Sequence, residues 1–283
     1  MPEISAVGVV GAGTMGHGIA QVAAQAGWRT TLYDVTEELS RKGLLRIADN
    51  LDAGIAKGKV TAEKKAEAMG RLRATGELKD LAGCQLIIEA APEDLPVKQK
   101  LFQKLSEVAA PDAILASNTS SLSLTEIAAA ATHPERVVGM HFFNPVHVMK
   151  LLELVRAYQT SGETLAAVQA AGERMGKQVI VVKDHPGFAS SRLGIALGME
   201  AIRMLEEGVA SAEDIDRAME LGYGHPMGPL KLTDLVGLDV RLAIAEYLHR
   251  ELGTPSFRPP QLLKKMVRAG KLGKKSGEGF YRY

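Results

Sequence analysis

Cysteine is almost absent from this sequence: Cys84 is the only one in 283 residues, so no disulfide can form within the chain. A lone cysteine on a predicted buried strand is expected to act as a small apolar residue rather than as a reactive thiol. Charge of one sign is also lacking, because 34 Lys and Arg residues balance 33 Asp and Glu residues, for a formal net charge of +1. This balance gives no reason to expect nucleic acid or an anionic membrane as a partner.

Long apolar runs are missing as well. The most apolar late stretch, 193–199, is far shorter than the roughly 20 residues that cross a bilayer, and Arg192 and Glu200 flank it. The first predicted strand follows Met1 closely, with no cationic segment before it, so we expect no secretory signal. These absences predict a cytoplasmic protein that has no membrane partner.

What the sequence does contain is organised around residues 7–18, which read VGVVGAGTMGHG. A β-branched apolar segment, 4–10, predicts a buried strand, and helical periodicity begins after it. Three glycines at the junction have the spacing G-x-G-x-x-G, which permits a tight turn, close approach of a pyrophosphate and close helix packing. With 29 glycines in the chain this spacing can arise by chance in a surface turn, but the flanking strand and helix favour a dinucleotide site. The residues assigned to it are Gly11, Ala12, Gly13, Thr14, Met15 and Gly16.

Asp34 strengthens this interpretation. It ends a second predicted strand, 30–33, about 20 residues beyond the glycines, where a carboxylate accepts hydrogen bonds from both ribose hydroxyls. The same carboxylate repels a 2′-phosphate. We therefore predict NAD, rather than NADP, as the cofactor.

Strands and helices alternate through the first two thirds of the chain, which predicts an α/β fold with a Rossmann-like doubly wound parallel sheet. Further strands are expected at 84–90, 114–117, 137–143 and 151–155. Between them, 36–70 is expected to form two helices that break at 57–59, with Thr61 capping the second.

Beyond Asp184 the strand patterns give way to helical ones, and Pro186-Gly187 marks the change. We expect two domains: residues 1–184 as the NAD-binding domain and residues 185–283 as a smaller all-helical domain. The helical segments are expected at 188–207, after a cap at Ser211, at 230–252 and at 261–269.

Polar residues gather after two of the predicted strands. Strand 114–117 leads into Asn118, Thr119, Ser120 and Ser121, and strand 137–143 carries His141. Such serines commonly cap a helix, as Ser121 or Ser123 would here, and a histidine in an apolar strand is commonly structural. Glu153 on the next strand favours chemistry instead, because a hairpin-like pairing would let its carboxylate orient the imidazole for proton transfer.

The chain closely resembles the short L-3-hydroxyacyl-CoA dehydrogenases, also called 3-hydroxybutyryl-CoA dehydrogenases, nearly end to end. The motifs that carry the resemblance are GAGTMG, IIEAAPED, SNTSSL, HFFNPVHVMKLLELV, DHPGF, GYGHPMGP, DLVGLD and GKKSGEGFY, together with Asp34. The resemblance implies NAD-dependent oxidation of a 3-hydroxyacyl-CoA in fatty acid β-oxidation. It also implies a homodimer formed through the C-terminal domain.

The resemblance also implies residue roles. It makes His141 the general base, Glu153 the acid that orients it and Ser120 a ligand near the reacting oxygen. It assigns NAD contacts to Asp34, Glu93, Lys98, Asn118, Asn144 and Lys275. Lys57 and Lys59, which on sequence alone would be solvated loop charges, are placed near the phosphates of coenzyme A.

Ser191 is a departure from the family, whose better-known members carry asparagine in the segment that reads PGFASSR here. The serine either takes over the contact with the substrate oxygen, directly or through a water, or the contact is absent and Ser120 with Asn118 must hold the oxygen. A third interpretation is that Ser191 only caps the following helix. We favour the contact, because a polar gap beside a charging oxygen would take up a donor.

Three other functions remain open at this stage. The fold suits a related dehydrogenase of a free hydroxy acid or sugar acid, such as L-gulonate, or an NAD-binding protein that is not an enzyme. A metal site formed by His141, His147 and Glu153 is the least favoured, because no second layer of ligand-orienting residues is visible and nicotinamide chemistry of this type needs no metal. We therefore expect no metal.

Overall fold

The computed structural model describes residues 3–283, and the chain divides into two compact units, Met1–Asp184 and His185–Tyr283. The first unit is built on one eight-stranded sheet with the order β3-β2-β1-β4-β5-β6-β7-β8. Its strands are β1 (Ala6–Val10), β2 (Arg29–Tyr33), β3 (Leu72–Thr75), β4 (Leu86–Glu89), β5 (Ile114–Ser117), β6 (Val137–Phe142), β7 (Leu151–Arg156) and β8 (Gln178–Lys183).

Strands β1 to β6 run parallel to one another, which confirms the Rossmann-like doubly wound sheet. The last two strands depart from this pattern, because β7 pairs antiparallel with β6 and β8 runs parallel to β7. The sequence did not predict β3 and β8. Both are edge strands with partly exposed residues. The sequence of β3, LRAT, has no continuous apolar run, whereas β8, QVIVVK, contains a β-branched apolar run at 179–182 that was a visible signal.

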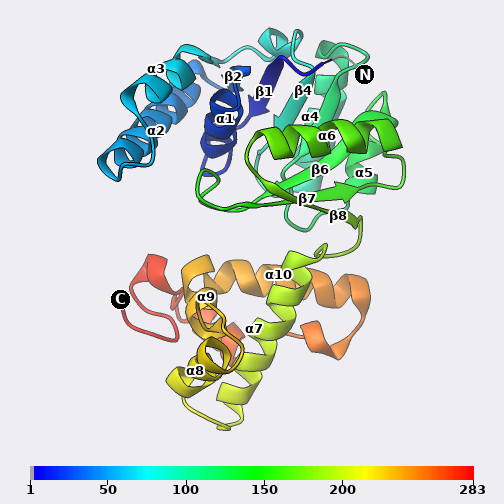
Figure 1. Ribbon diagram of the computed structural model, residues 1–283. Helices are drawn as coiled ribbons and strands as arrows, with labels where there is room; N and C mark the ends of the chain where they lie inside the picture. The colour runs from blue at the N-terminus through cyan, green and yellow to red at the C-terminus, as the bar shows by residue number, and fades with distance from the viewer. Residues whose placement is uncertain (1–2) are drawn as a thin grey trace. The chain divides into compact units, whose positions relative to one another are not determined.

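Helices cover both faces of the sheet (Figure 1). Ile19 of α1 and Val168 of α6 belong to the same apolar cluster as several strand residues. Phe102 of α4 and Ile127 of α5 are also buried, but they are not part of that cluster. The helices of this unit are α1 (Gly16–Gln25), α2 (Glu37–Ala56), α3 (Ala62–Gly70), α4 (Leu95–Val108), α5 (Leu124–Ala128) and α6 (Gly162–Arg174), with short 3₁₀ turns η1 (Leu78–Leu81) and η2 (Pro134–Arg136).

The pair of helices after β2 forms as predicted. Thr36 caps α2 by accepting a hydrogen bond from the Leu39 amide, and Thr61 caps α3 by accepting one from the Lys64 amide. Gly58 between them has φ +65°, a conformation that favours glycine and ends the first helix. Ser123, one of the two predicted candidates, caps α5.

Cys84 is 4% exposed and lies two residues before β4 begins. Burial raises the pKa of its thiol to about 11, so the sulfur stays protonated and unreactive at neutral pH. The prediction of a small apolar role is confirmed, although the strand itself is shorter than predicted.

The second unit is helical around its own core, which includes Ile195, Met199 and Leu248. Ser211 caps α8 by accepting from the Asp214 amide, as predicted. The predicted stretch 230–252 is not continuous: Gly237, at φ +107°, separates α9 from α10. The elements are α7 (Ser190–Glu206), α8 (Ala212–Gly222), α9 (Pro229–Val236), α10 (Leu238–Leu252) and α11 (Gln261–Arg268), with η3 (Pro255–Phe257) and η4 (Lys274–Ser276).

Two buried carboxylates fix the last residues of the chain in this unit. Asp234 accepts hydrogen bonds from the Phe280 and Tyr281 amides, both at 2.9 Å. Asp216 accepts one from the Tyr281 hydroxyl at 2.7 Å and one from the Leu230 amide at 2.8 Å, so it also caps α9. The closing segment is therefore part of the folded unit.

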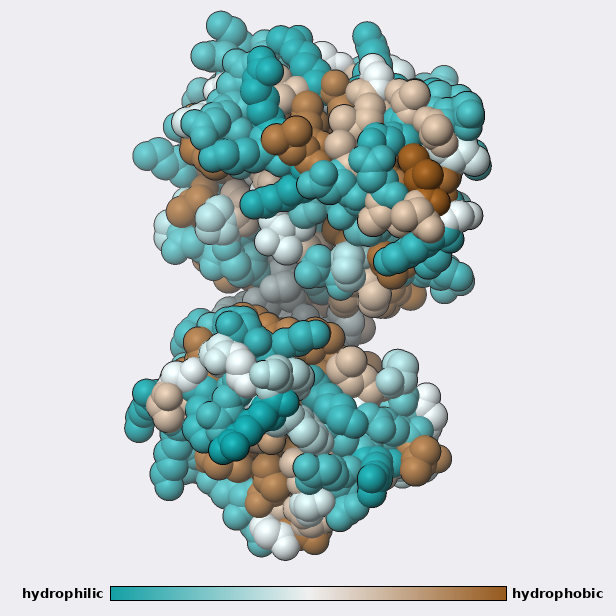
Figure 2. All heavy atoms as spheres, turned by 90° about the vertical axis from the view of Figure 1, so that its left-hand side faces the viewer, coloured by the Kyte–Doolittle hydropathy of each residue, from teal (hydrophilic) through white to brown (hydrophobic). Residues whose placement is uncertain are grey.

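Figure 2 shows mostly hydrophilic side chains on one face of each unit, with apolar side chains in small separate patches. Among residues 3–283, no helix combines the length and the apolar character that crossing a bilayer requires.

Candidate active site

The glycine-rich turn after β1 has the geometry that the sequence predicted. A Cβ atom on Gly11 would lie 2.7 Å from the Ala90 carbonyl oxygen, and one on Gly16 would lie 1.6 Å from the Gly11 carbonyl oxygen. These two glycines therefore allow close packing of turn, helix and sheet. A Cβ on Gly13 would meet nothing within 4 Å, so open space borders this backbone. This arrangement fits a pyrophosphate at the start of α1.

A cleft of about 830 Å³ opens beside the turn, at the carboxyl ends of β1, β2 and β4. This edge of a doubly wound sheet is where dinucleotides bind. The residues that line it include Gly11, Gly13, Thr14, Met15, Asp34, Ala90, Ala91, Pro92 and Lys100.

Asp34 has a second task that sequence reasoning missed. One carboxylate oxygen accepts a hydrogen bond from the Ala12 amide at 2.7 Å, and the other accepts one from the Val35 amide at 2.7 Å. The side chain therefore fixes the glycine-rich turn as well as lining the cleft. Asp34 can accept a hydrogen bond from the Ala12 amide because the glycine-rich turn folds back toward the end of β2. The number of residues between the glycines and Asp34 does not reveal this contact.

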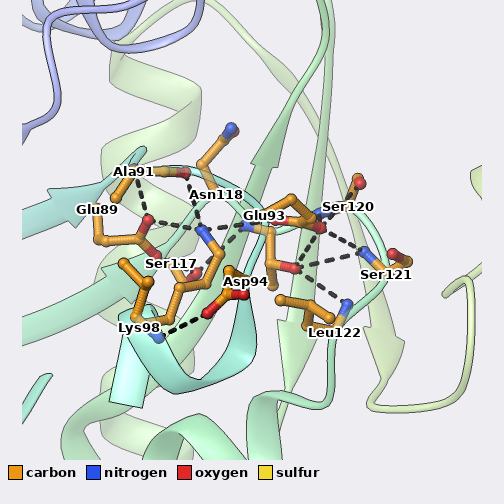
Figure 3. A network of polar contacts seen from close by, with 12 residues as sticks. Glu89, Ala91, Glu93, Asp94, Lys98, Ser117, Asn118, Ser120, Ser121 and Leu122 are labelled. Atoms are coloured by element: carbon orange, nitrogen blue, oxygen red, sulfur yellow. Dashed lines mark hydrogen bonds and ion pairs between the residues drawn. The ribbon is translucent and has the colours of Figure 1, made fainter. Parts of the chain in front are cut away.

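Glu93 organises the turn after β5 (Figure 3). Its Oε1 accepts hydrogen bonds from the Thr119 hydroxyl at 2.7 Å, from the Ser120 amide at 2.7 Å and hydroxyl at 3.0 Å, and from the Ser121 amide at 3.2 Å. Asn118, next to them, accepts from the Phe142 amide at 2.9 Å and so ties this turn to β6. The structure thus brings together Glu93, Asn118 and Ser120, which the sequence assigned to one site.

Lys98 does not line the cleft, although a residue that contacts NAD is expected to do so. It is 1% exposed. Its ammonium donates to Glu89 Oε1 at 2.6 Å and to the Ala91 carbonyl at 3.2 Å, and Glu93 Oε2 lies 3.5 Å away. Its contact with NAD stays a prediction. Glu89 was missed, although an acid at the end of an apolar strand was a visible signal.

His141 and Glu153 are brought into contact by the antiparallel pairing of β6 with β7, in which they are direct partners. His141 Nδ1 lies 2.9 Å from Glu153 Oε2. Glu153 is fully buried and His141 is 6% exposed, so the carboxylate orients the ring away from bulk water. The predicted pairing of His141 with Glu153 is confirmed, and it is made through Nδ1 of the ring.

A buried lysine, Lys177, donates hydrogen bonds to the loop after β6. Asn144 is exposed and precedes Pro145 through a cis peptide bond. The Lys177 ammonium donates to the Val146 carbonyl and, at 2.8 Å, to the Met149 carbonyl. Burial lowers the pKa of Lys177. This support for the loop was not predicted.

Lys57 and Lys59 are exposed at the tip of the α2–α3 hairpin. Burial, followed by the charges of His17, Lys177 and Lys57, lowers the pKa of His147. The charge of Lys57 therefore acts on the loop after β6, although it is the smallest of these contributions to the pKa of His147. His147 belongs to no metal-binding group, because residues 3–283 contain no cluster of three possible His, Cys, Asp or Glu ligands.

Ser191 and Lys275 lie in the second unit. Ala189 occupies the N-cap position of α7, so Ser191 lies in the first turn of that helix, and its role stays a prediction. The Lys275 ammonium is paired with Asp239 at 2.6 and 2.7 Å. Its contact with NAD stays a prediction.

Comparisons with known proteins agree with this geometry. Residues 6–185 match the family described as "3-hydroxyacyl-CoA dehydrogenase, NAD binding domain", and residues 187–283 match its C-terminal domain. A 3-hydroxybutyryl-CoA dehydrogenase of Mycobacterium tuberculosis is 48% identical over 99% of both chains. The human mitochondrial hydroxyacyl-coenzyme A dehydrogenase is 43% identical over 98% of this chain and 90% of its own length. The crystal structure of (S)-3-hydroxybutyryl-CoA dehydrogenase from Ralstonia eutropha superposes with a TM-score of 0.97 at 44% identity, over 99% of both chains.

Asp34 should set the choice of cofactor, because its carboxylate opposes a 2′-phosphate. We expect Asp34→Ser and Asp34→Arg to raise the NADP-to-NAD ratio of kcat/KM by about 10-fold or more. Asp34→Asn is the matched variant, because it keeps an oxygen for the Ala12 amide while removing the charge. Wild-type enzyme that used both cofactors equally well would contradict the assignment.

Proposed function

The chain belongs to the 3-hydroxyacyl-CoA dehydrogenase family, and we propose that it catalyses the reversible oxidation of L-3-hydroxyacyl-CoA, such as 3-hydroxybutyryl-CoA, to the 3-ketoacyl-CoA. Its cofactor is NAD. The observation that carries the proposal is the 2.9 Å contact between His141 and Glu153, in the same unit as the dinucleotide turn. The reaction places the enzyme in fatty acid β-oxidation or in its reverse.

His141 acts as the general base in this proposal. Its Nε2 takes the proton of the substrate 3-hydroxyl, and NAD, when bound, supplies the acceptor for the hydride. Glu153 fixes the ring through Nδ1 and stabilises the imidazolium that forms, since an ionised carboxylate 2.9 Å away favours the charged ring. In the reverse direction the imidazolium returns the proton to the 3-keto oxygen.

Ser120 supports the substrate oxygen from the turn that Glu93 holds, next to Asn118, whose proposed contact is with NAD. Four hydrogen bonds to one Glu93 oxygen fix this turn, so its polar groups need little reorganisation when charge develops. Ser191 is the remaining oxygen ligand in the proposal, and it fills the role of the asparagine found in other members of the family.

Two alternatives are separated from this proposal by simple assays. Formation of NADH from free hydroxy acids or L-gulonate, but not from 3-hydroxybutyryl-CoA, would indicate the related acid dehydrogenases. NAD binding without turnover of any of these substrates would indicate a protein that is not an enzyme.

Assembly and location are further proposals. We propose a homodimer formed through the helical unit, which exposes large apolar side chains in a single chain: Leu193 is 72%, Leu221 is 83% and Tyr223 is 78% exposed. A mass of 30.2 kDa by light scattering would rule out the dimer. We also propose a cytoplasmic location, which secretion of the native chain would contradict.

Replacing the base should slow the chemistry while sparing cofactor binding. We expect His141→Gln to lower kcat by about 10²- to 10⁴-fold, the usual reach of general-base catalysis, with nearly unchanged NAD affinity. Glu153→Gln should lower kcat as well, because the imidazolium loses its counterion. His133→Gln, at an exposed histidine of the same unit, is the control. A near-normal rate for His141→Gln would disprove the mechanism.

The hairpin lysines should recognise the coenzyme A handle. We expect the double variant Lys57→Gln/Lys59→Gln to raise KM for 3-hydroxybutyryl-CoA several-fold, up to about 10-fold, and less so at high salt. A truncated pantetheine thioester, which lacks the nucleotide phosphates, should be little affected. Lys79→Gln, an exposed lysine outside the hairpin, serves as the control. Equal losses on both thioesters would point to a structural role.

Ser191 should matter for turnover more than for stability. We expect Ser191→Ala to reduce kcat/KM by roughly 10-fold or more, about 1.4 kcal/mol, with little change in melting temperature. Ser211→Ala is the matched comparison, because it removes a true helix cap in the same unit and should cost about 1 kcal/mol of stability with turnover intact. Ser191→Asn should remain active. A folded but inactive Ser191→Asn enzyme would show that the pocket has been rebuilt.

A further inference from the structure

We propose that Glu89 is a positioning residue for this reaction: one buried carboxylate holds both the cofactor-side turn after β4 and the substrate-side turn after β5. Glu89 is the last residue of β4 and is fully buried. In the sheet it lies between Val10 of β1 and Ser117 of β5, at the strand ends where the dinucleotide cleft opens. The inference rests on the proposed function, which assigns roles to Ser120 and Glu93.

The Glu89 carboxylate accepts three hydrogen bonds, each from a different segment of the chain. Oε1 accepts from the Lys98 ammonium and from the Ala91 amide, both at 2.6 Å, and Oε2 accepts from the Ser117 hydroxyl at 2.6 Å. Ala91 lines the cleft. The Ser117 hydroxyl in turn accepts from the Thr119 amide at 3.2 Å, so the carboxylate reaches into the turn that carries Ser120 (Figure 3).

Lys98 links Glu89 to Glu93, because its ammonium lies close to both carboxylates. Its ammonium is buried and sits between two acids, with Glu89 at 2.6 Å and Glu93 at 3.5 Å. The Glu93 side chain is 37% exposed, so Glu89 is the nearer and better shielded counterion. Without Glu89, the stranded ammonium would draw Glu93 toward itself and away from the four donors of the Ser120 turn.

Stability alone does not explain the buried Glu89–Lys98 ion pair, because removing both charges from water costs free energy. A buried ion pair can be replaced by packed apolar side chains at little or no loss of stability, whereas removing one partner leaves an expensive unpaired charge. Here both acids, the lysine and the Ser117 hydroxyl instead fix groups that line the cleft or carry Ser120. We conclude that the charge serves geometry at the reacting centre.

The decisive variant removes both buried charges at once. Glu89→Gln/Lys98→Met should fold, because neither partner is left unpaired. At saturating NAD, where a lost contact of Lys98 with the cofactor does not contribute, its kcat/KM for 3-hydroxybutyryl-CoA should still be about 10-fold or more below wild type. Glu89→Gln alone should show at least this loss, together with a lower melting temperature. Glu38→Gln, which breaks an exposed pair with Lys42, is the control. Wild-type kcat/KM in the folded double variant would overturn the proposal.

A double-mutant cycle with Ser120→Ala separates positioning from general weakening of the fold. If the Glu89–Lys98 pair acts through the Ser120 turn, adding Ser120→Ala to the charge-free double variant should cost less than about 3-fold beyond the worse parent. Independent losses that multiply would overturn the inference. Wild-type enzyme without turnover of 3-hydroxybutyryl-CoA would instead remove the proposed function, and it can be recognised before any variant is made.

Discussion

The reversal of chain direction between β6 and β7 is the constraint on which the proposed chemistry depends. Direct partners in an antiparallel pair project from the same face of the sheet, with Cβ atoms about 5 Å apart. A histidine and a glutamate placed opposite one another therefore meet without help from any loop. A parallel neighbour would have needed a long crossover, and the alignment of ring and carboxylate would have depended on its packing.

Carboxylates shape the backbone at several places in this fold, in both units. Asp34 holds the glycine-rich turn, Glu93 the turn that carries Ser120, Asp216 the start of α9, and Asp234 the closing segment. Each receives backbone amides that belong to no regular ladder, and charge-assisted bonds of this kind are stronger than neutral ones. Turns that would otherwise fluctuate are thereby fixed next to groups that must keep their geometry.

The sequence predicted those parts whose signals are local or follow a fixed period. The glycine spacing with Asp34, the caps at Thr61 and Ser211, and the pairing of His141 with Glu153 all depend on short-range pattern or simple strand alternation. The contacts of Lys98 could not be read in this way, because they depend on how α4 lies against the ends of two strands. The same holds for Lys177, whose partners are backbone carbonyls that carry no sequence signal.

The sequence also failed to predict the edge strands of the sheet and the break between two helices. The edge strand β3 lacks the apolar run of a central strand, whereas the run at 179–182 in β8 was visible and was overlooked. The stretch 230–252 resembles one helix because its apolar positions continue through Gly237. A single backbone angle at that glycine divides it. Ser191 shows a related difficulty: a serine near a helix start suggests a cap, but α7 begins at Ser190 and its N-cap position is Ala189.

The anchoring of residues 280–283 makes the end of this chain unlike an ordinary tail. The hydroxyls of Tyr281 and Tyr283 and two backbone amides are donors to Asp216 and Asp234, which have almost no access to water. Loss of these four residues would remove donors from two buried anions and loosen α9 along with them. The effect of such a loss would therefore reach the whole helical unit rather than residues 280–283 alone.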